Sequence, residues 1–140
     1  MLYTELHKDL FTVSDDYFLA HCIASDLGMG AGIAVPMQKT FGLRGKIINT
    51  NIKLKHPIAI LTGRVFNLIT KAKSSGKPTL RSLHMTITQM RDIALLNGIK
   101  RIAMPKIGCG LDRLQWGEVR EIIKKEFEFT DIEILVCVWE

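Results

Sequence analysis

The segment 104–116 carries the residue types and the spacing best suited to chemistry. It follows a short apolar run typical of a buried strand and leads into a helical pattern. Between them, Gly108 and Gly110 flank a single residue, Cys109. Small residues let backbone N–H groups approach an anion, and the positive N-terminal end of the next helix adds to the attraction. The segment therefore predicts a phosphate-binding loop.

Two charged side chains could act on a ligand held by this loop. Asp112 lies just beyond the glycine pair, two residues after Gly110, where a carboxylate can reach past the phosphates to a reacting carbon. The same residue could instead cap the following helix or stabilise its dipole. Lys71 stands at the end of an apolar strand. It could be an ordinary solvated lysine or a nucleophile. A nucleophilic lysine must lose a proton, which a neighbouring carboxylate can accept.

Other reactive residues have simpler explanations. His21 falls inside an apolar strand, which favours a hydrogen-bonded core histidine over a ligand or a base. Cys109 has no histidine near it in sequence, which argues against a thiolate nucleophile. The three cysteines, Cys22, Cys109 and Cys137, are too few and too scattered for a disulfide framework. His, Cys and Asp residues do not cluster at metal-ligand spacing, so we expect no metal site.

Composition limits the class of protein. With 140 residues, the chain is expected to form one domain over 1–140 with a single substantial core. The net charge of +5 suits a polyanionic partner such as a nucleotide, but the excess is spread along the chain. No apolar run approaches the roughly 18–20 residues that span a bilayer. Early charges argue against a signal peptide, so we expect a cytoplasmic protein without membrane association.

Hydrophobic periodicity divides the chain into alternating strands and helices. We expect strands at 2–7, 17–23, 57–62, 64–70, 101–104 and 132–139, and helices ending near 41, over 79–97 and over 116–127. Pro36 is compatible with the first of these helices only in its first turn. The strands 57–62 and 64–70 are expected to form a hairpin at Gly63. The stretch 42–56 is the least regular, and we expect a loop with one short strand.

This alternation predicts a mixed sheet of about six strands covered by helices on both faces. In such sheets, ligands bind outside the carboxyl ends of the strands. The loops expected at the ends of strands are 9–11, 24–33, 71–77 and 106–113. We therefore expect them to converge on one cleft.

Four segments also match a known family. They are KDLF at 8–11, AHCIASD at 20–26 with MGAGIA at 29–34, LITK at 68–71, and PKIGCGLDRLQW at 105–116. Together they resemble the macro domain family, and more narrowly its branch of terminal ADP-ribose protein glycohydrolases, also called O-acyl-ADP-ribose deacylases. The resemblance covers nearly the whole chain. It implies the macro domain fold, a three-layer α/β/α arrangement around a mixed sheet.

The resemblance also implies an activity. The expected enzyme is an ADP-ribosyl hydrolase that removes ADP-ribose from carboxylate esters, such as glutamyl-ADP-ribose on proteins or O-acyl-ADP-ribose. By the family mechanism, Lys71 is the nucleophile that attacks the anomeric carbon of the distal ribose. Asp112 is the general acid/base that completes the reaction. ADP-ribose is the product, and no cofactor is expected.

Ligand contacts follow from the same resemblance. Asp9 would accept a hydrogen bond from the adenine amino group, the Leu10 backbone would lie beside the base, and Trp139 would line the adenine pocket. The full expected set is Asp9, Leu10, His21, Ala24, Gly30, Ala31, Gly32, Ile33, Lys106, Ile107, Gly108, Cys109, Gly110, Leu111 and Trp139. Lys8 and Ala24 depart from the family pattern, at positions where relatives often have Gly and Ser. Both departures affect binding more than chemistry.

Three alternatives share the fold. They are a DNA-base ADP-ribosyl glycohydrolase of the antitoxin type, a phosphatase acting on ADP-ribose 1″-phosphate, and a non-catalytic ADP-ribose reader. A dense basic stripe would favour the first, and the sequence shows none. Replacing Lys71 by alanine separates an enzyme from a reader. The expected partners are ADP-ribose and ADP-ribosylated proteins or O-acyl-ADP-ribose, with ADP-ribosylated nucleic acid as a further candidate, and the chain is expected to be a monomer.

Overall fold

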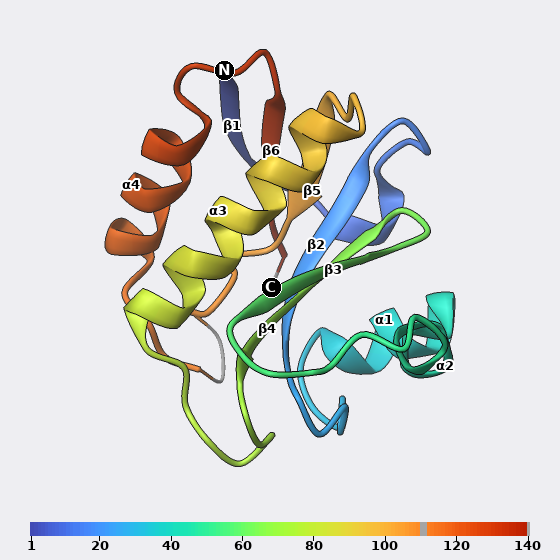
Figure 1. Cartoon of the computed structure of the whole chain (residues 1–140). Coiled ribbons are helices and arrows are strands. Elements are labelled where there is room, and N and C mark those ends of the chain that lie inside the picture. Colours follow the sequence, from blue (N-terminus) through green and yellow to red (C-terminus); the bar gives the residue numbers. More distant parts are fainter. Residues whose placement is uncertain (110–111, 140) are drawn as a thin grey trace.

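A mixed sheet of six strands forms the centre of the computed structural model, which describes residues 1–109 and 112–139 (Figure 1). The strands are β1 (Leu2–His7), β2 (Phe18–Ala24), β3 (Ile58–Thr62), β4 (Val65–Lys71), β5 (Arg101–Met104) and β6 (Glu133–Val138). Their order across the sheet is β1-β6-β5-β2-β4-β3. Only the β3–β4 pair is antiparallel among these neighbours, because a tight turn at Gly63 joins the two strands. The predicted hairpin is confirmed.

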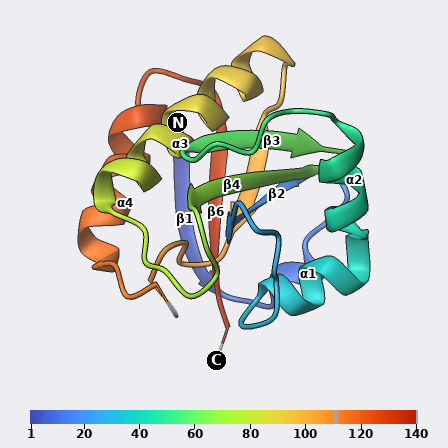
Figure 2. The same cartoon turned by 60° about the horizontal axis from the view of Figure 1, so that its bottom comes forward.

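Helices cover both faces of the sheet (Figure 2). On one face lie α1 (Ala34–Phe41) and α2 (Leu43–Asn49), and on the other lie α3 (Leu80–Leu96) and α4 (Trp116–Phe127). A short 3-10 helix, η1 (Leu10–Thr12), follows β1. This three-layer arrangement around a mixed sheet confirms the predicted fold class.

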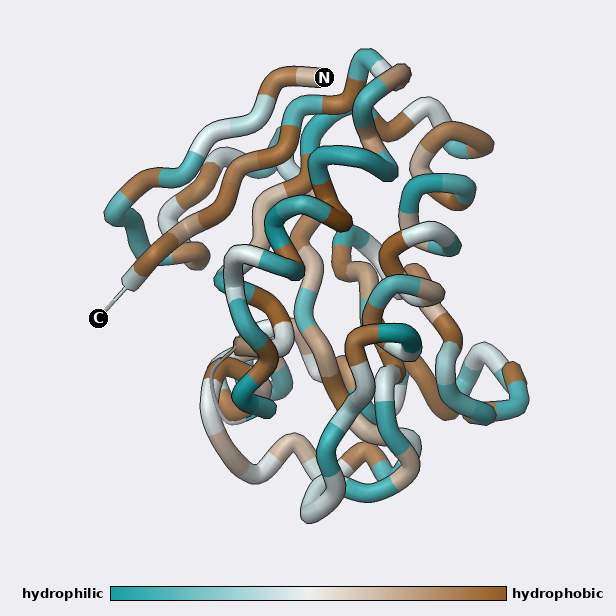
Figure 3. The backbone as a smooth tube through the Cα atoms, turned by 90° about the vertical axis from the view of Figure 1, so that its left-hand side faces the viewer, coloured by the Kyte–Doolittle hydropathy of each residue, from teal (hydrophilic) through white to brown (hydrophobic). Residues whose placement is uncertain are grey.

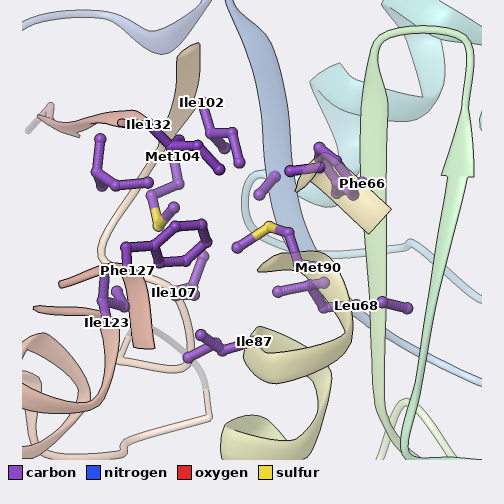
Figure 4. Packing of buried hydrophobic residues seen from close by; sticks show 14 of the residues in the cluster. Phe66, Leu68, Ile87, Met90, Ile102, Met104, Ile107, Ile123, Phe127 and Ile132 are labelled. Atoms are coloured by element: carbon purple, nitrogen blue, oxygen red, sulfur yellow. The ribbon is translucent and has the colours of Figure 1, made fainter. Parts of the chain in front are cut away.

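Strand residues alternate between two hydrophobic cores, one on each face of the sheet. Phe66 of β4 faces the α3–α4 layer, where the same core contains Met90 and Phe127 (Figure 4). Val65 and Ile69 belong to the core beneath α1 and α2. The first six residues of β4 are buried, and they include the polar Asn67 and Thr70. The helices carry both hydrophilic and hydrophobic residues along their length (Figure 3). In the described part of the chain, no helix is long and apolar enough to cross a membrane.

The segment 42–56 contains a helix where a loop with a short strand was expected, so that prediction was wrong. Helix α2 buries Leu43 and Ile47 completely, and their spacing of four residues is helical. Gly42 separates α2 from α1 by adopting a left-handed conformation with φ 60°. Gly45 lies inside α2 and is a poor helix former, which weakened the helical pattern in the sequence.

The remaining elements lie within one or two residues of their predicted bounds, and local sequence explains their ends. Helix α3 begins after Thr79, which forms a capping box with Ser82. Pro36 occupies the third position of α1, inside its first turn. The loops that follow β2, β4 and β5 lie together at the lower end of Figure 1. The fold therefore gathers these loops at the carboxyl ends of parallel strands.

Candidate functional site

A cleft of about 480 Å³ opens at the carboxyl ends of the central strands. Its described walls include the ends of β2 and β4, the segment 29–34, parts of the loop after β4, the segment 105–108, Asp112 and Trp139. The loops 24–33, 71–77 and 106–113 therefore converge as predicted. The loop after β1 contributes no residue to the described lining. A volume of this size is typical of a site for a small-molecule ligand.

Lys71 and Asp112 meet inside the cleft. The ammonium nitrogen of Lys71 donates to the carboxylate Oδ1 of Asp112 across 2.6 Å. Lys71 is the last residue of β4, and Asp112 precedes α4, so two separate elements bring the pair together. Each side chain is 13% exposed, which leaves both groups within reach of a ligand. A partly buried amine beside a carboxylate is a plausible nucleophile with its proton acceptor.

The segment 29–34 forms one wall. Gly30, Ala31, Gly32 and Ile33 all line the cleft, as predicted. Gly32 takes a left-handed φ of 60°, which glycine adopts without strain. Helix α1 starts immediately afterwards without a side-chain cap, so the Ala34 N–H at its first position suits an anion. The Val35 and Met37 N–H groups donate to Gly32 and Ile33, and Pro36 has no N–H.

The segment that follows β5 forms the facing wall. Lys106, Ile107 and Gly108 line the cleft. Gly108 has φ 75°, and a Cβ there would approach the side chains of Leu83 and Leu114 to 3.0 Å. The position therefore requires glycine both for its conformation and for the close approach of the loop to α3.

Cys109, Gly110 and Leu111 are also predicted to contact ADP-ribose. Gly110 and Leu111 lie outside the described residues. Cys109 is half-buried and absent from the described lining, and burial raises the pKa of its thiol to about 11. Because the thiolate is the reactive form, this agrees with the sequence argument against a nucleophilic role.

Trp139 also lines the cleft, and its predicted contact with adenine stays a prediction. The residue is 62% exposed, and its ring stands against His7 with ring centroids 5.4 Å apart. Ala24 at the end of β2 also lines the cleft. Neither Asp9 nor Leu10 belongs to the described lining: Asp9 caps η1 by accepting from the Phe11 N–H at 3.0 Å, and Leu10 is buried in the core.

His21 lies in the core, and the structure corrects its inclusion among the ligand contacts. The ring is fully buried in the middle of β2, and its Nε2 pairs with Oδ1 of Asn67 at 2.8 Å. Burial lowers the pKa of His21 to about 4, so the imidazole is neutral at physiological pH. The interpretation of a hydrogen-bonded core histidine is therefore right.

Several residues of the lining were not predicted. They are Cys22, Ile23, Met29, Ala34, Ser74, Lys77 and Pro105. Ser74 and Lys77 follow Lys71 in one polar loop. Only their nearness to Lys71 in the sequence could have indicated that these two residues line the cleft. Among the described residues, no group of three or more His, Cys, Asp or Glu side chains could hold a metal ion.

Comparison with known proteins gives a relative that matches almost the full length. The chain is 44% identical over 136 residues to ADP-ribose glycohydrolase OARD1 of Homo sapiens, covering 95% of this chain and 89% of that protein. No protein-family model matches the sequence.

Solved structures share the fold at low sequence identity. The macrodomain of Thermus aquaticus DarG superposes with a TM-score of 0.83 at 16% identity, covering 99% of this chain and 98% of that one. Thermosipho africanus DarTG, solved in complex with ADP-ribose, gives a TM-score of 0.72 at 17% identity, covering 93% of this chain and 39% of that one. At these identities, the likeness concerns the fold.

Proposed function

This chain belongs to the macro domain family, and from that premise we propose that it is a hydrolase that releases ADP-ribose from carboxylate esters. Its 44% sequence identity to ADP-ribose glycohydrolase OARD1 supports the proposal that the chain is a hydrolase acting on ADP-ribosyl groups. The observation that carries the proposal is the contact between Lys71 and Asp112 inside the cleft. A reader of ADP-ribose would need no such pair.

The walls of the cleft suit the diphosphate of ADP-ribose. The glycine-containing segments 29–34 and 105–108 face a common space that the N-terminus of α1 also borders. Lys77 and Lys106 add positive charge to the lining. Backbone N–H groups, a helix N-terminus and cations are the usual partners of phosphate oxygens. Trp139 offers a ring for the adenine base, a contact worth roughly 1–3 kcal/mol.

Catalysis would proceed in two displacements. In the first, Asp112 accepts a proton from Lys71, and the neutral amine attacks the anomeric carbon of the distal ribose. The bond from that carbon to the ester oxygen breaks, and the carboxylate leaves with the electron pair. In the second, water adds to the transient lysyl-ADP-ribose while Asp112 moves protons, which frees ADP-ribose and restores Lys71. The cleft contributes by holding the ribose within attack distance.

The proposed substrates are glutamyl-ADP-ribose on proteins and O-acyl-ADP-ribose, and the reaction consumes only water. Every group named in the two displacements belongs to this chain or to the substrate. We therefore propose that no cofactor takes part.

Release of free ADP-ribose from a glutamyl-ADP-ribosylated peptide tests the proposal. Wild-type protein should release it, and Lys71→Ala should not, while binding ADP-ribose as before. Lys73→Ala is the matched control, because Lys73 is an exposed lysine in the same loop that does not line the ADP-ribose cleft. Binding of ADP-ribose without turnover by the wild type would identify a reader and refute the hydrolase.

A further inference from the structure

The contact between β2 and β4 continues beyond the ends of the two strands. The last Cα pair in their register is Ala24 with Lys71. The next residue, Ser25, donates its N–H to the Lys71 carbonyl at 2.9 Å. The backbone that carries Lys71 is therefore fixed by the segment that leaves β2, in addition to the sheet itself.

Asp26 extends this contact with its side chain. Its Oδ2 accepts the Ser74 N–H at 2.8 Å, and its Oδ1 accepts the Ser74 hydroxyl at 2.6 Å and the Gly28 N–H at 3.0 Å. Three donors, two of them from the loop after Lys71, thus converge on one carboxylate. Hydrogen bonds to an ionised carboxylate are stronger than those between neutral groups. The same hydrogen bonds hold the pKa of Asp26 at about 2, so the carboxylate stays charged at neutral pH.

The backbone around Gly28 is shaped to allow this contact. A Cβ on Gly28 would stand 2.4 Å from the Ser74 hydroxyl oxygen, which is closer than real atoms approach. Leu27 and Met29 on either side have φ values of 54° and 46°, a left-handed conformation that such residues rarely adopt. An unfavourable backbone of this kind persists where surrounding contacts impose it.

Arg44 of α2 supplies such contacts from the opposite side. Its Nε donates to the Leu27 carbonyl at 2.9 Å, and a terminal guanidinium nitrogen donates to the Gly28 carbonyl at 2.8 Å. The segment 25–29 is thus held between α2 and the loop after Lys71. This gives Asp26 a fixed base from which to hold Ser74.

We propose that Asp26 is a positioning residue for the reaction: by binding Ser74, it fixes the turn that follows Lys71 and so holds the Lys71 amine at its place beside Asp112. The inference rests on the proposed function, because it assumes that Lys71 is the nucleophile. Asp26 itself is absent from the described lining of the cleft, so its effect reaches the substrate through the residues that it positions, Lys71 and the cleft-lining Ser74. Misplacing a reacting group by about 1 Å can cost roughly 100-fold in rate.

The test compares Asp26→Ala with wild type in turnover of a glutamyl-ADP-ribosylated peptide. We expect kcat to fall about 10- to 100-fold, while the ADP-ribose dissociation constant, measured with the same proteins, changes less than about threefold. Ser74→Ala should lower kcat in the same direction, and Ser74→Thr should restore it, because threonine keeps both donors. Asp131→Ala is the matched control: Asp131 is an exposed carboxylate that pairs with Lys100 before β6, and its loss should change neither quantity.

The outcomes separate this inference from the proposed function. Normal kcat in Asp26→Ala would overturn the inference and leave the hydrolase intact. A fall in kcat accompanied by equal losses of ADP-ribose binding and of thermal stability would also overturn it, because that result indicates a merely structural role. If Asp26→Ala does not fold, the contrast between Ser74→Ala and Ser74→Thr decides. A wild-type protein without turnover would remove the proposed function and the inference together.

Discussion

At the residue scale, the account depends on two side chains whose contact joins separate parts of the chain. Lys71 and Asp112 are 41 positions apart, yet the sequence already pointed to both. Lys71 stands at the end of an apolar strand, and Asp112 lies in the loop just beyond Gly108 and Gly110. Their contact could not be read from the sequence, since it depends on how β4 and the segment after β5 are placed in the sheet. Asp9 accepts the Phe11 N–H as the cap of η1, and its contact with adenine stays a prediction.

Replacing Asp112 by asparagine should lower kcat by roughly 10²-fold or more, which is the usual contribution of a general acid/base. Asparagine keeps the size of the side chain but cannot accept the Lys71 proton. Binding of ADP-ribose should change little, because the contact of Asp112 is with Lys71. Steady-state kinetics alongside calorimetric titration would measure both effects. Unchanged turnover would show that Asp112 is not the general acid/base. A capping role would not explain such a result, because the N-cap of α4 is Gln115.

At the element scale, the sequence predicted helices and strands well where apolar residues follow a regular period, and poorly elsewhere. Helix α4 has the predicted bounds because Val119, Ile123 and Phe127 recur at intervals of four. Helix α2 was missed because only Leu43 and Ile47 are buried and a glycine lies between them. Contacts between loops were not predictable in the same way, because hydrogen bonds such as those of Arg44 leave no periodic pattern.

Arg44→Ala should weaken ADP-ribose binding by about tenfold, or roughly 1.4 kcal/mol, because the wall of the cleft that follows Gly28 loses part of its support. The change removes the two hydrogen bonds that hold the Leu27 and Gly28 carbonyls, just before the wall formed by Gly30 to Ile33. Calorimetric titration with ADP-ribose is the measurement. Lys46→Ala is the matched control, because Lys46 is an exposed cation on the same helix. Equal affinities for all three proteins would contradict the role of Arg44.

The packing of α3 against α4 should depend on pH through Glu126. Burial disfavours its charged form, but hydrogen bonds from Thr88 and His84, together with the charge of Arg91, outweigh burial and lower the pKa of Glu126 from 4.5. A carboxyl with a lowered pKa in the folded state stabilises the fold above its unfolded pKa, and this stabilisation is lost as the pH falls.

The free energy of unfolding should therefore decrease when the pH is lowered below about 4.5. Glu126→Gln should show a smaller decrease over the same range, because it has no carboxylate to protonate. Urea denaturation at a series of pH values would compare the two proteins. Parallel pH profiles would show that Glu126 makes no contribution to this dependence.

At the scale of the whole molecule, the alternation of strands and helices predicted the layered sheet, and the comparisons agree with it. Parallel strands direct their carboxyl ends to one edge, which made a common cleft predictable before any contact was known. The exact lining of the cleft was not predictable. Met29, for example, lines the cleft from a left-handed backbone conformation, which no sequence pattern indicates. The fold was thus more predictable than the surface that its loops create.

Binding of ADP-ribose should stabilise the whole fold, because the cleft is built from loops that follow several strands. A ligand present at 100 times its dissociation constant adds about 2.7 kcal/mol, which corresponds to a rise in Tm of several degrees. AMP, which lacks the second phosphate and the distal ribose, should raise Tm less. Thermal denaturation monitored by circular dichroism measures the effect. Equal shifts for the two ligands would argue against contacts beyond the adenosine half.

In the proposed mechanism, Lys71 forms a covalent bond with the substrate, and trapping that bond would identify the nucleophile. The lysyl-ADP-ribose adduct can open its ribose ring to an imine, and borohydride reduces that C=N bond to a stable amine. Wild-type protein would be incubated with a glutamyl-ADP-ribosylated peptide in the presence of borohydride, digested and analysed by mass spectrometry, beside Lys71→Ala. The account predicts an ADP-ribose-derived mass on the peptide that contains Lys71, and none in the variant. Release of ADP-ribose by the wild type with an adduct on another residue, or full activity of Lys71→Ala, would contradict the proposed mechanism.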